Sequence, residues 1–165
     1  MDGIHFSDNT TSAEDAGWRA VAANLSDLAA SGVTSVDGIT VGLVAPGDTR
    51  WDWVEGVYGG ISSALNQFGG VLLGGDCSAG TNRLLAITAL GRLGPLQLLR
   101  SGAEPGDVVV TSGAHGLSRL GLALLRQEVD PATAALSQAL QERAIQQHRR
   151  PCLLYTSDAA DDNTC

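Results

Sequence analysis

The sequence of 165 residues has no long apolar run and no excess of basic residues. A membrane-spanning helix needs about 20 consecutive apolar residues, and no stretch approaches this length. No signal peptide with a basic and then an apolar region opens the chain. Lys and Arg number 10 against 18 Asp and Glu, which gives a net charge of -8. Binding to a phosphate backbone depends on clustered cations, so we expect a cytoplasmic protein that binds neither nucleic acid nor membranes.

Cysteine is also scarce, and the usual phosphate-binding loop is missing. Cys77, Cys152 and Cys165 show neither the spacing of metal ligands nor a disulfide framework. The glycine-rich turns at 74–76 and 112–116 lack the Gly-Lys-Ser/Thr that ends a Walker loop. An acidic chain can still bind phosphates through magnesium, because carboxylates hold the ion and the ion holds the phosphates.

Two helices are predicted from apolar residues that recur at helical spacing. The first spans Ser12 to Ser31, with Ser12 as the N-cap and Gly32 after its end. The second runs from Trp51 or Trp53 to Phe68. Their expected buried positions are Trp18, Val21, Ala22, Leu25, Leu28 and Ala29 in the first, and Val54, Val57, Ile61, Leu65 and Phe68 in the second.

Short apolar runs between the helices predict strands. The expected strands are 39–45, a short buried strand 71–73 that ends at Gly-Gly-Asp, 83–90, and 108–111. Two more helices are expected at 118–126 and 131–148, the second capped by Asp130 before Pro131. Helices that alternate with strands indicate an α/β or α+β fold rather than a helical bundle.

Three polar positions at the ends of these elements are candidates for chemistry. Asp27 lies in an otherwise apolar helix, where a carboxylate needs a cation or lies in solvent. Asp76 follows two glycines, which would let a ligand approach the backbone so that the aspartate reaches a phosphate-bound metal. The alternative is a turn in which Asp76 forms a hydrogen bond with its own backbone. The planar guanidinium of Arg100 is suited to binding phosphate. The alternative is a surface arginine beside the Pro105-Gly106 turn. Each position alone is a weak signal.

Their order resembles that of the thiamine-monophosphate kinases, a family in the superfamily of aminoimidazole ribonucleotide synthetase. The likeness rests on His5-Phe6, Asn-Leu-Ser-Asp-Leu-Ala-Ala at 24–30, Gly-Gly-Asp at 74–76 and Arg-Ser-Gly-Ala-x-Pro-Gly-Asp at 100–107, and it covers nearly all of 1–151. The resemblance implies a PurM-like N-terminal mixed sheet with helices on one face, spanning residues 1–98. Residues 99–151 would be the truncated start of a second α+β domain, and 152–165 a non-native tail.

The resemblance also implies ATP-dependent phosphorylation of thiamine monophosphate to thiamine diphosphate, with Mg²⁺, by a homodimer. By their match to the family's motifs, Asp27 and Asp76 would be metal ligands. Tyr58, Gly75, Asp76 and Arg100 would bind ATP, and His5 would contact thiamine monophosphate. Tyr58 also fits a core position at helical spacing, and a lone histidine is often structural. Joining two phosphates needs charge neutralisation and positioning, so no catalytic side chain is expected.

The chain departs from the family's pattern at several places. The acidic stretch expected upstream and the Asp-rich signature expected downstream are absent, and Leu117 replaces a common aspartate. We therefore expect little or no kinase activity from this polypeptide alone. The alternatives are another superfamily member (selenophosphate synthetase, a hydrogenase maturation factor or aminoimidazole ribonucleotide synthetase) or a non-catalytic fragment for nucleotide binding or dimerisation.

Overall fold

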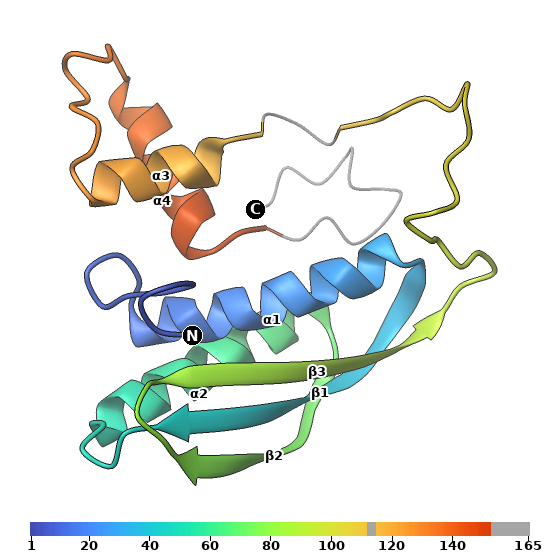
Figure 1. Ribbon diagram of the computed structural model, residues 1–165, viewed down its shortest axis with the longest axis horizontal. Helices are drawn as coiled ribbons and strands as arrows, with labels where there is room; N and C mark the ends of the chain where they lie inside the picture. The colour runs from blue at the N-terminus through green and yellow to red at the C-terminus, as the bar shows by residue number, and fades with distance from the viewer. Residues whose placement is uncertain (112–114, 153–165) are drawn as a thin grey trace.

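A computed structural model describes residues 1–111 and 115–152 of the chain (Figure 1). In chain order its elements are α1 (Ala13–Ala30), β1 (Val33–Ala45), α2 (Trp51–Phe68), β2 (Val71–Ala79), β3 (Leu84–Leu93), α3 (Leu117–Leu125) and α4 (Gln138–Arg149). No helix in this described part is long and apolar enough to cross a membrane. Most of the glycine-rich turn at 112–116 and nearly all of the predicted tail at 152–165 lie outside the described residues.

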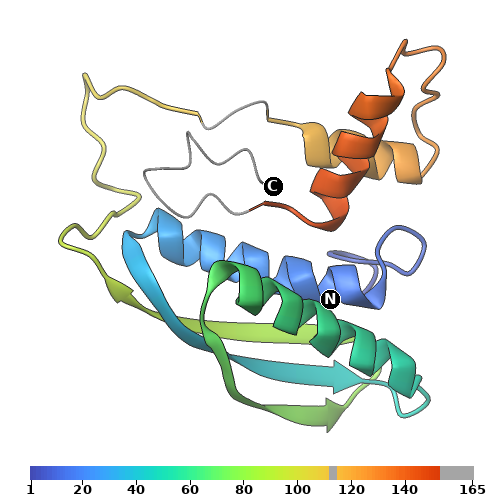
Figure 2. The same cartoon turned by 180° about the vertical axis from the view of Figure 1, so that it is seen from behind.

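A three-stranded sheet carries α1 and α2 on one face and leaves its other face uncovered (Figures 1 and 2). The strand order is β2-β1-β3, with β1 parallel to β2 and antiparallel to β3. The parallel pair is joined by α2, as parallel strands need a crossover connection. The predicted mixed sheet with helices on one face is confirmed.

The first helix forms as its sequence predicts. The Ser12 hydroxyl accepts a hydrogen bond from the Asp15 amide at 3.1 Å, which satisfies one of the free amides of the first turn. The helix ends before Gly32, whose φ of +90° favours glycine. A Cβ at Gly32 would also overlap the carbonyl oxygen of Leu96. Two independent constraints therefore fix glycine at this end.

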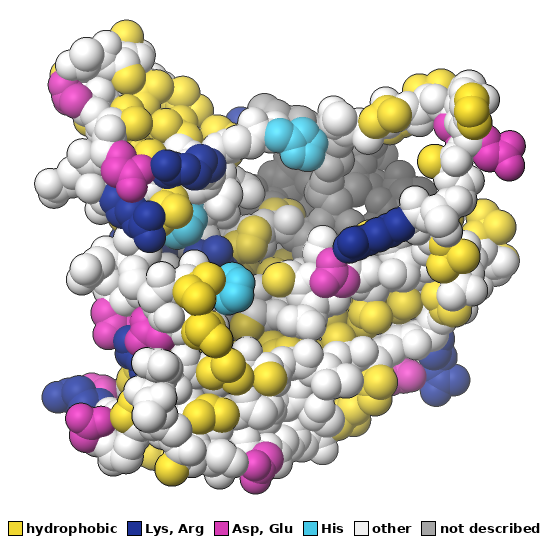
Figure 3. All heavy atoms as spheres, in the orientation of Figure 1, with side chains coloured by type: hydrophobic (Ala, Val, Ile, Leu, Met, Phe, Trp, Pro, Cys, Tyr) yellow, Lys and Arg dark blue, Asp and Glu magenta, His cyan; other side chains and the backbone are white. Residues whose placement is uncertain are grey.

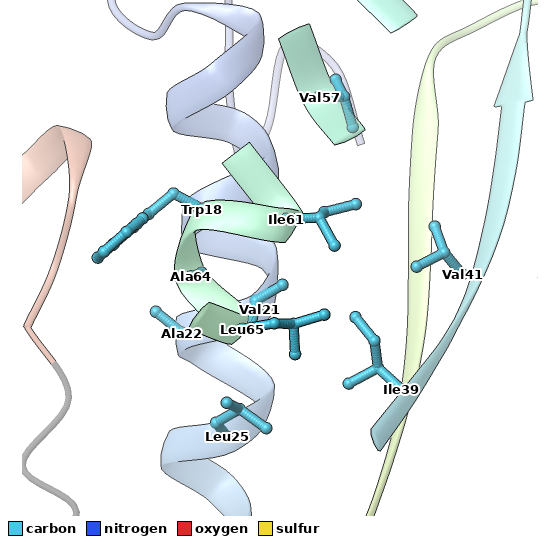
Figure 4. Packing of buried hydrophobic residues seen from close by; sticks show 10 residues of the cluster. All are labelled: Trp18, Val21, Ala22, Leu25, Ile39, Val41, Val57, Ile61, Ala64 and Leu65. Atoms are coloured by element: carbon cyan, nitrogen blue, oxygen red, sulfur yellow. The ribbon is translucent and has the colours of Figure 1, made fainter. Parts of the chain in front are cut away.

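The core lies between the two helices and the inner face of β1 (Figure 4). Successive side chains of a strand point to opposite faces, so Ile39, Val41 and Leu43 face the helices and are buried. Full burial of one such side chain stabilises the fold by about 1.5–3 kcal/mol. The cluster comprises Trp18, Val21, Ala22, Leu25, Ile39, Val41, Val57, Ile61, Ala64 and Leu65.

The two helices approach each other backbone to backbone. A Cβ at Gly17 of α1 would overlap the carbonyl oxygen of Val57, and one at Gly60 of α2 would overlap that of Glu14. Both glycines are buried. The helix pair therefore requires glycine at both positions. This requirement is stricter than that for an apolar residue on the buried side of a helix.

The structure corrects the prediction for residues 71–76. The strand does not end at Gly74, because β2 continues to Ala79. It is also exposed along its whole length rather than buried. The reason is its position at the sheet edge: pairing with β1 continues from Gly42–Asp76 to Ala45–Ala79, while the helices cover mainly β1 and β3.

The connection after β3 also differs from the prediction. Residues 108–111 form no strand, and the side chains of Val108, Val109 and Val110 are 83–90% exposed. Figure 3 shows hydrophobic side chains along this extended connection, which runs away from the sheet toward α3. A run of β-branched residues predicts a strand only where a neighbouring strand is present to pair with it.

The predicted helix at 131–148 begins late, at Gln138. Asp130 instead caps a turn, since its carboxylate accepts hydrogen bonds from the amides of Ala132 and Thr133. Ala135 then adopts a φ of +50°, which is incompatible with a helix. Ser137 provides the true N-cap, accepting from the Leu140 amide.

The α3–α4 hairpin docks on the N-terminal half of α1. Arg150 donates to Asp15 at 2.6 Å and pairs with Glu14 at 2.9 Å. The indole N–H of Trp18 donates to the carbonyl of Pro151 at 3.3 Å. His148 is 6% exposed, with its ring near Arg19 and Ser118. Charged and aromatic contacts at the end of α4 therefore hold the hairpin in place.

The glycine contact predicts opposite effects at neighbouring positions of α2. Gly60→Ala should lower the free energy of unfolding by about 1–3 kcal/mol, because the added methyl forces the helices apart. Gly59→Ala should raise it by about 0.5–1 kcal/mol, because nothing lies within 4 Å of its Cβ and alanine favours the helix. Urea denaturation followed by circular dichroism measures both. Equal effects of the two substitutions would contradict the proposed contact.

Burial of His148 predicts a dependence of stability on pH. Burial lowers the pKa of His148 below its usual value, and the cations Arg19, Arg126 and Arg149 add to this effect, against a hydrogen bond with Ser118 that raises it. As the pH falls below about 6.5, the unfolded chain gains a proton that the folded chain does not, so stability falls. The melting temperature should therefore drop between pH 7.5 and 5.5, and the drop should be smaller in His148→Gln. A drop of the same size in both proteins would rule out this histidine as the cause.

Candidate functional site

The sequence-predicted site residues fall into two groups, the first of which lies on β2. Register places Cys77 beside Leu43 on the face covered by helices, where Tyr58 of α2 lies close to it. Burial, and then the neighbouring Cys77, raises the pKa of Tyr58. Asp76 is one residue earlier and so points to the uncovered face. There the Ser78 hydroxyl donates a hydrogen bond to the Asp76 carboxylate at 2.9 Å.

Gly75 precedes Asp76 on β2, and packing against β1 alone explains why it is glycine. A Cβ at this position would overlap the carbonyl oxygen of Val41 on the adjacent strand. The sequence interpretation attributed the glycine to close approach of a ligand. The sheet requires it in any case, so its contact with ATP stays a prediction.

The second group surrounds α1. A cavity of about 370 Å³ opens between the N-terminal segment, α1 and β3, and its lining includes His5, Arg19 and Asn24. The Asn24 amide group donates to the Ala20 carbonyl at 2.8 Å, which fixes its orientation. Leu85 and Ile87 line the same cavity from β3. The structure thus places the predicted substrate contact His5 in a partly apolar cavity with polar groups on its wall.

Asp27 lies in the last turn of α1, and Arg100 follows a segment that contacts the end of this helix. Asp27 is exposed, which agrees with the alternative that its carboxylate lies in solvent. The amide of Leu98 donates to the carbonyl of Ser31 at 3.1 Å, which brings the start of the connection that carries Arg100 to the end of α1. Within residues 1–111 and 115–152, Arg100 forms neither an ion pair nor a side-chain hydrogen bond. No residue that the structure describes therefore competes with an anion for its guanidinium.

The two predicted metal ligands are not brought together. Asp27 lies on the helical layer, whereas Asp76 points to the uncovered face of the sheet. Among the described residues, no group of three or more His, Cys, Asp or Glu side chains could hold a metal ion. Carboxylates suit Mg²⁺, but each position supplies one ligand where an ion needs several oxygens. The described residues thus do not form a complete magnesium site.

Sequence reasoning missed a charged and aromatic cluster around Arg83, which lines a cavity of about 580 Å³. Its guanidinium carbon lies 4.7 Å from the ring centroid of Trp53, and its Nε donates to the Asp2 carboxylate at 2.8 Å. Asp8 pairs with it at 2.9 Å, and Phe6 stacks on Trp53. The cluster fastens the N-terminal segment to the start of β3. No local spacing could have revealed it, because Asp2 and Arg83 are 81 residues apart.

The sequence of the chain is similar to those of a known family and of curated enzymes. Residues 1–93 match the N-terminal domain of the AIR synthase related protein family. The chain is 58% identical over 153 residues to a thiamine-monophosphate kinase of Prochlorococcus marinus, covering 92% of this chain and 45% of that protein. It is 45% identical over 152 residues to the enzyme of the same name from Synechococcus elongatus, with the same coverage. The chain therefore spans about half the length of the curated relatives it matches.

Solved structures of similar sequence share the fold. Thiamine monophosphate kinase from Aquifex aeolicus superimposes with a TM-score of 0.78 at 29% identity, covering 96% of this chain and 50% of that one. A structure described as AaThiL complexed with AMPPCP and TMP superimposes with a TM-score of 0.75 at 27% identity, covering 96% and 48%. The mixed sheet with its two covering helices is thus an arrangement that these kinases share.

Proposed function

The chain belongs to the AIR synthase related protein family, and we propose that it is part of a thiamine-monophosphate kinase. Such an enzyme transfers the γ-phosphate of ATP to thiamine monophosphate and forms thiamine diphosphate. The observation that carries the proposal is 58% identity to a protein of that name along 92% of this chain. The similar fold of a relative in complex with AMPPCP and TMP supports it. We place the enzyme in the cytoplasm.

The residues of the chain fit phosphate binding better than covalent catalysis. Arg100 offers a guanidinium that forms no ion pair within residues 1–111 and 115–152, and Asp76 offers a carboxylate that accepts a hydrogen bond from Ser78. Transfer between two phosphates depends on positioning and on neutralising charge, so no side-chain nucleophile is needed. Mg²⁺ is part of this proposal, with Asp27 and Asp76 as one ligand each. Since they do not complete a site, we expect little or no turnover from this chain alone.

The uncovered face of the sheet supports the further proposal of a homodimer. This face carries Thr40 and Gly42 of β1 and their partners Thr88 and Ala86 of β3. These small side chains make a flat surface that two copies can share. A sheet with one bare face commonly buries it against another layer.

Magnesium-dependent nucleotide binding tests the proposed function. Calorimetric titration of the chain with AMPPCP should show binding that weakens at least tenfold without Mg²⁺. Asp76→Asn should weaken binding by a similar factor, because it removes the carboxylate charge that attracts the ion. Glu142→Gln is the control, since it removes an exposed carboxylate charge on α4. Unchanged affinity for Asp76→Asn in a folded protein would remove this residue from the site.

The proposed dimer is tested by placing a charge on the bare face. Thr40→Arg should shift the chain from dimer to monomer in sedimentation velocity, because it buries an unpaired guanidinium at the interface. Gln67→Arg, on the exposed side of α2, serves as the control and should leave the dimer intact. Circular dichroism checks that both variants fold. A monomeric parent chain, or a dimer that tolerates Thr40→Arg, would refute this interface.

A further inference from the structure

The α3–α4 hairpin lies beside α1 (Figures 1 and 2), and the buried side chain of His148 is part of this contact. From α1, Nη1 of Arg19 approaches Nε2 of the imidazole ring to 3.3 Å. A guanidinium can only donate hydrogen bonds, so Nε2 must accept and carries no proton. The proton of the neutral ring is then on Nδ1, which lies 3.5 Å from the Ser118 hydroxyl of α3. The contact between hairpin and helix therefore requires a neutral histidine.

The charged groups around His148 also oppose a second proton on its ring. They are Arg19 of α1, Arg126 at the end of α3 and Arg149 of α4. The carboxylate of Asp15, one helical turn before Arg19, pairs with Arg150 at 2.6 Å. Among the described residues no carboxylate forms an ion pair with His148. Burial and then these cations lower the pKa of His148, against a hydrogen bond with Ser118 that raises it.

Polar contacts near the end of α4 attach the hairpin to α1. Arg150 pairs with two carboxylates of α1, and the indole N–H of Trp18 donates to the carbonyl of Pro151 at 3.3 Å. Among the described residues, the buried cluster between the sheet and its two helices includes none from α3 or α4. Regions with few buried apolar contacts open at a lower free energy than the core. The hairpin can therefore leave α1 while the sheet and its two helices stay folded.

Release of the hairpin would change the cavity of about 370 Å³ beside α1. Pro151, which follows α4, forms part of the wall of this cavity, and so does Arg19. Detachment removes Pro151 from the wall and separates the Arg19 guanidinium from Nε2 of His148. The docked hairpin therefore closes part of the cavity.

We propose that the α3–α4 hairpin is a pH-sensitive cover of this cavity, docked on α1 while His148 is neutral and detached, with Pro151, when His148 is protonated. As the pH falls below about 6.5, the detached state gains a proton that the docked state does not. The ratio of detached to docked chains should therefore rise up to about tenfold between pH 7.5 and 5.5. This response needs no nucleotide, metal or substrate, and so does not depend on the proposed function.

Hydrogen exchange at the Trp18 indole measures this equilibrium in the unaltered chain, because its N–H is bonded to Pro151 only while the hairpin is docked. Its protection factor, relative to free tryptophan at the same pH, should fall up to about tenfold between pH 7.5 and 5.5. At each pH it should be lower than that of the Val41 amide in the central strand, since the hairpin opens before the core unfolds. Unchanged protection at pH 5.5, or protection equal to that of Val41, overturns the proposal.

Two histidine variants identify the group that titrates. His148→Gln should abolish the fall in Trp18 protection, because glutamine offers Arg19 a carbonyl acceptor and gains no proton. His115→Gln is the matched control, an exposed histidine in the turn before α3, and should keep the fall. A fall that persists in His148→Gln, or that is lost in His115→Gln, assigns the response to other groups and overturns the proposal. The measurement on the unaltered chain stands without either variant.

Discussion

The backbone contact between α1 and α2 is the constraint on which the rest of the fold depends. Because Gly17 and Gly60 carry no side chains, the two helices lie close together over one face of the sheet. That pair covers β1 and part of β3 but reaches little of β2. The exposure of β2, which carries Asp76, thus follows from how narrowly the helices pack.

The sequence predicted those elements whose signals are local. Periodic apolar residues and the Ser12 cap determine α1, and the same periodicity defines α2. The strands of the sheet were harder to predict from the sequence, because pairing partners and not propensity decide where a strand ends. Val71 to Leu73 reads as a buried run yet belongs to a longer exposed edge strand, whereas Val108 to Val110 finds no partner. Side-chain hydrogen bonds at Asp130 similarly replaced a helix by a turn.

For the candidate site, the sequence identified residues but could not assign them to faces. Tyr58 of α2 contacts β2 on the face covered by helices, whereas the Asp76 side chain of β2 points to the uncovered face. Only the register of β2 with β1 shows this difference. The sequence analysis did not single out Arg19. Its neighbour on the helix, Asp15, pairs instead with Arg150, 135 positions away, and no local pattern contains such a contact.

The exchange of partners at Asp15 couples two distant parts of the chain. While Arg150 holds Asp15, the α3–α4 hairpin stays on α1, and Arg19 forms no ion pair with any residue that the structure describes. If the hairpin lifts, Asp15 becomes free to neutralise Arg19. Docking of the hairpin and ion pairing within α1 therefore exclude each other at Asp15, so contacts at the end of α4 decide the charge balance on the first turns of α1.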